Sequence, residues 1–169
     1  MAAHLSIVHH PASASLAMKT KKILLARPNK FIVDEMKGLL KDSNFLPVPI
    51  SNLDEIHKFS KEEVGGVVVS TAVISSIKED YEDVILDVTS AFPGIPVMLA
   101  TLVEVELMKK SINIRLQKVG LDYHIRSITE VETKSSIDPR HDLVIVHKDD
   151  IGNKEKYAHT LQVVKKHFS

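Results

Sequence analysis

The most constraining feature of this chain is a regular alternation of short apolar runs, rich in Val and Ile, with amphipathic helical patterns. This order is typical of β-α units that build a parallel sheet covered by helices on both faces. The predicted strands cover residues 23–26, 46–50, 67–70, 97–100 and 123–128, with a further strand at 143–147. Several of them are continuous apolar runs, as expected for strands buried on both faces. The sequence therefore predicts an α/β fold.

Apolar residues at helical spacing predict helices over about residues 30–42, 53–59, 81–92 and 104–119, and a last helix over 157–168. Ile32, Met36 and Leu40 mark the core face of the first. Asn29 and Asn52 stand where they can cap the first two helices, and Gly120 where it can end the fourth. We find no internal repeat and no glycine-rich phosphate loop.

Composition narrows the classes of protein that fit. A chain of 169 residues with 44% hydrophobic content suits one globular core. The 22 basic and 22 acidic side chains cancel, so no overall field attracts nucleic acid or an anionic membrane. The absence of cysteine excludes disulfides, a thiolate nucleophile and cysteine-ligated metals, and it suits the cytoplasm. No apolar run reaches the roughly 18 residues that span a bilayer.

Domain organisation follows from the same observations. Residues 1–20 are rich in Ala, Ser and His and are expected to form a flexible tail, followed by a single domain over residues 21–169. His4, His9 and His10 in the tail lack acidic or cysteine partners and make a poor ligand set. We therefore expect no metal site and no cofactor. The last forty residues contain no helix-turn-helix pattern, which argues against direct DNA binding.

Five phrases carry a resemblance to a known family. They are KILLARPNKFIVDEMKGLLKDSNF, LPVPISNLDEI, VGGVVVST, FPGIPVMLAT and VGLDYHIRS, which together cover roughly residues 21–128. In order and spacing they resemble the receiver domain of two-component response regulators. The resemblance implies a doubly wound, flavodoxin-like sheet of five parallel strands in the order 2-1-3-4-5, with ligands at the carboxyl ends of the strands.

The resemblance also implies a chemistry that this chain lacks in part. Receivers accept a phosphoryl group on an Asp after strand three, with a divalent cation held by an acidic pair after strand one. Here the acidic pair falls on Arg27 and Pro28, and the acceptor falls on Ser70, or on Thr71 if the register slips by one. Neither hydroxyl can form an acyl phosphate. These departures indicate a degenerate form, a pseudo-receiver.

The later positions match the family in part. Thr101 matches the hydroxyl after strand four, Tyr123 matches the switch aromatic, and Arg126 replaces the lysine that contacts the phosphoryl group. Arg27, Ser70, Thr101 and Arg126, with Thr71, would form an anion-friendly cluster that either is locked by internal hydrogen bonds or binds a small anion. The plainer readings are that Arg27 is a solvated turn residue and that Thr101 satisfies backbone groups at a strand end.

Residues 129–153 depart from the family as an insertion before the last helix. Its apolar strand, Leu143, Val144, Ile145 and Val146, has three readings. It pairs antiparallel with the strand at 123–128, it extends the sheet of a second subunit, or it completes the chain's own core. The second reading makes these four residues an interface and the chain a homodimer.

Three functions remain open from the sequence. The first is a non-catalytic, cytoplasmic signalling module that acts through a protein partner, with no nucleic acid and no membrane. The second is a small-anion or ligand-binding protein, or a small enzyme, using Ser70 or Thr71 with His124 or His147 as base and with acids such as Asp149 and Asp150. The third is a domain that a protein kinase phosphorylates on Ser70 or Thr71.

Overall fold

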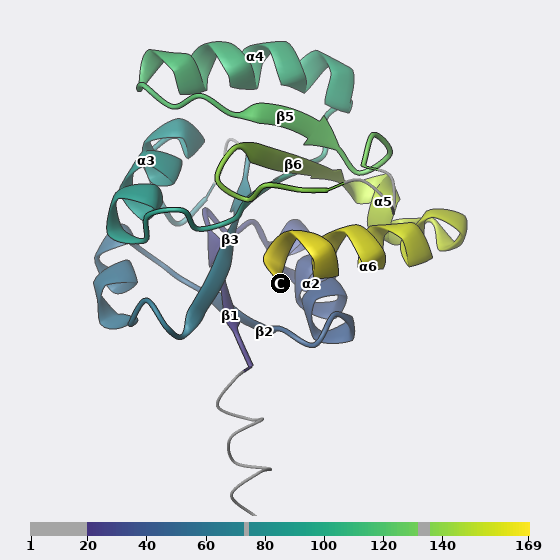
Figure 1. Cartoon of the computed structure of the whole chain (residues 1–169), viewed down its shortest axis with the longest axis horizontal. Coiled ribbons are helices and arrows are strands. Elements are labelled where there is room, and N and C mark those ends of the chain that lie inside the picture. The colour runs from purple at the N-terminus through teal and green to yellow at the C-terminus, as the bar shows by residue number, and fades with distance from the viewer. Residues whose placement is uncertain (1–19, 73–74, 132–135) are drawn as a thin grey trace, which may run out of the picture.

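The computed structural model describes residues 20–72, 75–131 and 136–169, and shows one sheet of six parallel strands with helices on both faces (Figure 1). Almost all of the predicted tail, including His4, His9 and His10, lies outside the described residues, as do positions 132–135 of the insertion. The strands are β1 (Lys22–Ala26), β2 (Leu46–Pro49), β3 (Val64–Ser70), β4 (Val97–Thr101), β5 (His124–Ser127) and β6 (Asp142–His147). Their spatial order is β2-β1-β3-β4-β6-β5.

The described ranges also contain five α-helices and one 3-10 helix, of which the last two α-helices follow β6. These helices are α2 (Lys30–Asp42), η2 (Leu53–Lys58), α3 (Tyr81–Ala91), α4 (Val105–Lys118), α5 (Lys148–Gly152) and α6 (Lys154–Phe168). The predicted second helix is the 3-10 helix η2, and Asn52 at its N-cap makes no side-chain capping hydrogen bond. Gly120 follows α4 with a left-handed φ of 82°, as expected for a glycine that ends a helix. None of the described helices is long and apolar enough to cross a bilayer.

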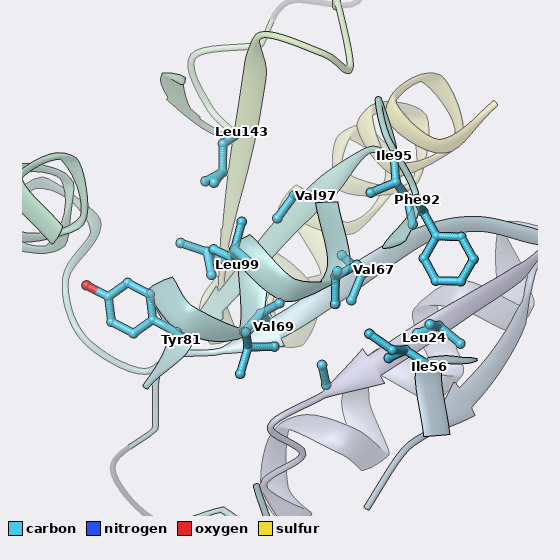
Figure 2. Close-up of a cluster of buried hydrophobic side chains, with 14 of the residues drawn as sticks. Leu24, Ile56, Val67, Val69, Tyr81, Phe92, Ile95, Val97, Leu99 and Leu143 are labelled. Carbon is cyan, nitrogen blue, oxygen red and sulfur yellow. The ribbon is translucent and has the colours of Figure 1, made fainter. Parts of the chain in front are cut away.

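The four central strands are buried on both faces, which explains their continuous apolar sequences. Side chains of η2, α3 and α4 cover one face of the sheet, and they pack with strand side chains in the core cluster of which Figure 2 draws a part. Side chains of α2 and α6 cover the other face, where Met36, Leu40, Val164 and Phe168 are buried. The side chain of Ile32 lies outside the described set.

The predicted order 2-1-3-4-5 is confirmed, and the additional strand β6 takes its place within it. β6 lies between β4 and β5 and runs parallel to both, with Leu143 opposite Val97 on one side and Ile125 on the other. The predicted antiparallel pairing with the strand at 123–128 is therefore wrong. Residues 128–141 separate β5 from β6, and a connection of this length suffices for a parallel crossover.

Burial accounts for the order of these two strands. Leu143, Val144, Ile145 and Val146 are at most 1% exposed, whereas β5 runs from the exposed His124 through half-buried residues to the buried Ser127. The more apolar strand takes the central position, and the more polar β5 forms the edge of the sheet. The four side chains expected at an interface lie in the chain's own core, as the third reading of this segment predicted.

Candidate functional site

The carboxyl ends of β1, β3, β4 and β6 lie side by side at one edge of the sheet. Ser70 pairs with Ala100, and Thr101 pairs with His147, so the ends of β3, β4 and β6 are in register. Arg27 follows the last residue of β1. This edge is where open parallel sheets place their ligand sites. It brings together Arg27, Ser70, Thr71 and Thr101, four of the residues that the sequence singled out.

Arg27 is almost fully buried, at 5% exposed, and its guanidinium is held by backbone oxygens. Nε donates to the oxygen of Glu79 at 2.8 Å, and one terminal nitrogen donates to the oxygens of Ser70 at 2.9 Å and Ala72 at 2.7 Å. Its φ of 51° is left-handed, a conformation that costs free energy for a residue with a Cβ. The side chain thus fixes the β1–α2 turn to the segment after β3.

The hydroxyl groups at this edge satisfy nearby backbone groups. Ser70 Oγ accepts from the N–H of Ala72 at 3.0 Å, and Thr101 Oγ1 accepts from the N–H of Val103 at 3.0 Å. Both are local turns in which a side chain replaces a backbone acceptor. Thr71 Oγ1 makes only a long contact, 3.5 Å, with the oxygen of Ala100. Pro28 contributes its backbone oxygen, which accepts from Ser75 Oγ at 3.3 Å.

Tyr123 and Arg126 lie away from these groups. Tyr123 precedes the first residue of β5 and therefore lies at the amino end of that strand, away from the carboxyl ends. Burial raises the pKa of its hydroxyl. Arg126 directs its guanidinium to Asp142, the first residue of β6, at 3.5 Å, and to the oxygen of Ser136 at 3.3 Å. The structure therefore does not bring Arg126 to the cluster of Arg27, Ser70 and Thr101.

His147 takes the position beside Thr101 that sequence reasoning gave to residues of β5. Since β6 is the strand next to β4, the strand end beside Thr101 belongs to His147 and not to a residue of β5. His147 also begins α5 in a capping box: its Nδ1 accepts from the N–H of Asp149 at 3.0 Å, and its own N–H donates to Asp150 at 2.8 Å. The continuous apolar run of β6 was the signal that could have predicted a central strand.

Among the residues considered for an enzyme, His147 contacts Asp149 and Asp150, but the hydroxyl of Ser70 lies far from both candidate bases. His124 begins β5, at the amino ends of the strands, and its side chain is largely exposed. Its Nδ1 lies 3.2 Å from Oδ1 of Asp142. Ser70 and His147 end strands that are separated by β4, so roughly 10 Å divides the two strand axes. No direct Ser70–His147 hydrogen bond is formed across that distance. Among the residues that the structure describes, no three His, Asp or Glu side chains cluster as a metal site.

Two pockets of more than about 300 Å³ open at the carboxyl edge of the described part of the sheet. The first, of about 430 Å³, is lined by Glu104, Val105, Glu106, Ser127, Thr129, His147, Asp149, Asp150 and Lys156. Burial raises the pKa of Asp150 within it. The second, of about 380 Å³, is lined by Arg27, Thr71, Ala72, Asp80, Tyr81, Val103, Met108, Ser111 and Arg115. Sequence reasoning missed Asp80, Tyr81, Ser111 and Arg115, because no motif joins residues of α3 to residues of α4.

Comparison with known proteins gives a likeness in structure alone. No protein-family model and no curated protein matches the sequence. The fold is similar to a response regulator receiver protein from Sinorhizobium medicae WSM419, with 12% sequence identity and a TM-score of 0.50 over 87% of this chain and 98% of that one. It is also similar to a response regulator receiver domain protein from Clostridium thermocellum, with 15% identity and a TM-score of 0.50 over 86% and 96%. The chain therefore has a receiver-like, flavodoxin-like fold, with a sixth strand inserted between the fourth and fifth.

Proposed function

We propose that this chain is a non-catalytic signalling module, a pseudo-receiver that acts through contacts with a protein partner. The observation that carries the proposal is the guanidinium of Arg27, which donates to the backbone oxygens of Ser70, Ala72 and Glu79. A fixed positive charge thus stands where the receiver-like fold would need carboxylates for a divalent cation.

The acceptor position supports the same proposal. Formation of an acyl phosphate needs a carboxylate nucleophile, and Ser70 supplies a hydroxyl that accepts a hydrogen bond from its own turn. The backbone oxygen of Ser70 is also engaged by Arg27. Divalent cations are hard ions that require oxygen ligands, and a guanidinium already in contact with those oxygens opposes their binding.

The surface supports contact with a protein. Leu102, Val103, Leu107 and Ile114, on α4 and the loop before it, are between 44% and 67% exposed. Exposed apolar side chains that gather on one element mark a surface that a partner can cover. If the partner is a second copy of this chain, the protein is a homodimer. This surface replaces the buried β6 as the place for that contact.

Acetyl phosphate with Mg²⁺ tests the loss of receiver chemistry. We expect intact-mass analysis to show no added phosphoryl group, while a receiver with an intact acidic pair is labelled under the same conditions. Magnesium alone should leave the amide chemical shifts of residues 27 and 70–72 unchanged. A Mg²⁺-dependent gain of one phosphoryl group would refute the proposal.

Light scattering tests the contact surface. If the chain forms a homodimer through α4, the variant Leu107→Glu with Ile114→Glu becomes monomeric. Leu46→Glu is the matched control, because Leu46 is 45% exposed but begins β2. A dimer that survives both α4 substitutions would contradict this surface.

A further inference from the structure

The second pocket lies where the order of strands reverses. The chain places β2 on one side of β1 and β3 on the other, so the reversal falls between β1 and β3. Ligands of open α/β sheets bind outside the carboxyl ends of the strands at such a point. Arg27 follows β1, and Thr71 and Ala72 follow β3, so one wall of the pocket stands at this position, while the other walls come from the loop after β4 and from α3 and α4. Its volume of about 380 Å³ is that of a small-molecule site.

The polar lining of the pocket consists mainly of hydrogen-bond donors. Arg115 is 46% exposed at its side chain, and its closest charged partner is Glu82, at 3.5 Å. That distance exceeds the roughly 2.8 Å of a charge-assisted hydrogen bond, so the pair leaves donors of the guanidinium open to an acceptor. Ser111 lies one turn before Arg115 on α4 and lines the same pocket. Asp80 is the carboxylate among the described lining residues, on the α3 side.

Tyr81 adds a donor that the fold leaves unused. The residue is 5% exposed, and its hydroxyl has no hydrogen-bond partner. Ser111 approaches this hydroxyl without completing a hydrogen bond, and the guanidinium of Arg115 stands 5.3 Å from the ring centroid. Figure 2 shows the hydroxyl pointing away from the other labelled side chains of the core. A buried hydroxyl without a partner is costly, so a ligand oxygen that displaces the side chains covering it and accepts from it gains binding free energy.

The remaining walls are apolar. Val103 is 47% exposed and Met108 is half-buried, and both line the pocket. Exposed apolar surface next to convergent donors suits a ligand with an acid group at one end and an apolar body at the other. Arg27 and Arg115 carry two positive charges against the single carboxylate of Asp80, which gives the described lining a net positive charge.

We propose that this pocket binds a small organic anion, whose acid group accepts hydrogen bonds from Arg115, Ser111 and Tyr81 while its apolar body contacts Val103 and Met108. The binding is non-covalent. It differs from the anion cluster of Arg27, Ser70, Thr101 and Arg126, because three of the donors belong to α3 and α4. The site goes beyond the proposed signalling role and does not depend on it.

Titration with phenyl phosphate, followed by amide chemical shifts, tests the site in the full chain. We expect saturable shifts at residues 71–72, 81, 103 and 111, with benzoate giving the same pattern. Benzyl alcohol supplies the apolar body without the acid group, and inorganic phosphate supplies the acid group without the body. Each should bind at least about tenfold more weakly than phenyl phosphate, benzyl alcohol because it lacks the charge-assisted contact and inorganic phosphate because it buries no apolar body.

Two variants assign the binding to named donors, and a third serves as the control. Arg115→Gln should weaken phenyl phosphate at least about tenfold, and Tyr81→Phe by a smaller factor, since it removes one neutral donor. Lys110→Gln removes an equal charge from an exposed position of α4 outside the pocket and should leave the affinity unchanged. Thermal melts of each variant show whether the fold is kept.

Several results would overturn the site. They are an absence of saturable shifts with phenyl phosphate at millimolar concentration, equal binding of benzyl alcohol, and equal loss of affinity in Arg115→Gln and Lys110→Gln. These outcomes leave the proposed signalling role untouched, because that role is tested by acetyl phosphate and not by non-covalent anions.

Discussion

Nε of Arg27 donates to the backbone oxygen of Glu79 at 2.8 Å, which joins the turn after β1 to the loop before α3 across 52 residues of sequence. The same guanidinium reaches the segment after β3 through Ser70 and Ala72. One side chain therefore ties together three pieces of backbone at the carboxyl edge of the sheet. Arg27 thus has a structural role at this position, because it holds these oxygens together much as a bound divalent cation would.

Arg27→Ala should destabilise the protein, because it removes three hydrogen bonds and leaves backbone oxygens without a partner. We expect the free energy of unfolding to fall by about 3 kcal/mol, the scale of losing buried bonds to a charged donor. Arg27→Lys should recover only part of this, since an ammonium cannot match the planar fork of a guanidinium. Urea denaturation measures the difference.

Lys110→Ala, exposed on α4, serves as the control and should change the stability by less than about 0.5 kcal/mol. An equal effect of the two alanine variants would contradict the role of Arg27.

His167 predicts a loss of stability as the pH falls. The ring is fully buried in α6; its Nε2 donates to the oxygen of Val97 at 2.8 Å, and its Nδ1 has no hydrogen-bond partner. Burial lowers the pKa of His167 to about 4, although the charge of Asp142 acts in the opposite direction. In the unfolded chain the pKa of a histidine is near 6.5, so between pH 6.5 and 4 the unfolded state binds the proton and the folded state does not.

The contribution of neutral His167 to the free energy of unfolding is thus fully present above pH 6.5 and is lost as the pH falls toward 4. The loss approaches about 3 kcal/mol. His167→Gln keeps a donor for Val97 and does not titrate, so its free energy of unfolding should fall less over this range. His57→Gln, at an exposed position of η2, should keep the slope of the unmodified protein. Denaturation curves at several pH values measure this, and identical slopes for all three proteins would be inconsistent with a buried neutral His167.

Sequence reasoning predicted the six strands of the sheet because their signal is local. A run such as VGGVVVS is apolar at almost every position, and only a strand covered on both faces buries all of it. The carboxyl-edge positions of Arg27, Ser70 and Thr101 followed from the strand ends. The order of β5 and β6 could not be predicted in this way. It depends on which of the two strands gains more free energy from burial in the centre of the sheet. That comparison depends on the whole sheet and on the length of the connection between them.

The lining of the second pocket was beyond prediction for a related reason. Tyr81 and Arg115 lie on different helices, and the sequence shows each only as one member of its own helical pattern. The three hydrogen bonds from Arg27 to backbone oxygens could not be predicted either. Every residue has a carbonyl oxygen, so no residue type indicates which oxygens Arg27 reaches. Periodicity predicts faces of elements, whereas these contacts depend on how the elements dock.

Ile145→Ala tests the central position of β6. Ile145 is fully buried, so the loss of its side chain should leave a cavity and lower the free energy of unfolding by about 3 kcal/mol. Ile125→Ala, in the edge strand β5, is the matched control, because Ile125 is only partly buried. We expect it to cost about 1 kcal/mol. Chemical denaturation measures both, and a larger effect at Ile125 than at Ile145 would contradict the order of the two strands.

Gly66→Ala tests how α6 docks on the sheet. A Cβ at Gly66 in β3 would lie 2.3 Å from Cδ1 of Phe168 and 3.2 Å from the backbone oxygen of Pro96, so the aromatic ring would have to move. Because Phe168 is 3% exposed in a packed core, we expect a loss of about 2 kcal/mol in the free energy of unfolding. Gly38→Ala is the matched control: a Cβ at Gly38 in α2 would meet nothing within 4 Å, and alanine favours helix by about 1 kcal/mol. The two glycine variants should therefore shift the melting temperature in opposite directions.

Phe168→Leu should relieve part of the cost in the Gly66→Ala background, so the double variant should be more stable than the sum of the single effects predicts. Additive effects of the two substitutions would show that Gly66 and Phe168 do not pack against each other.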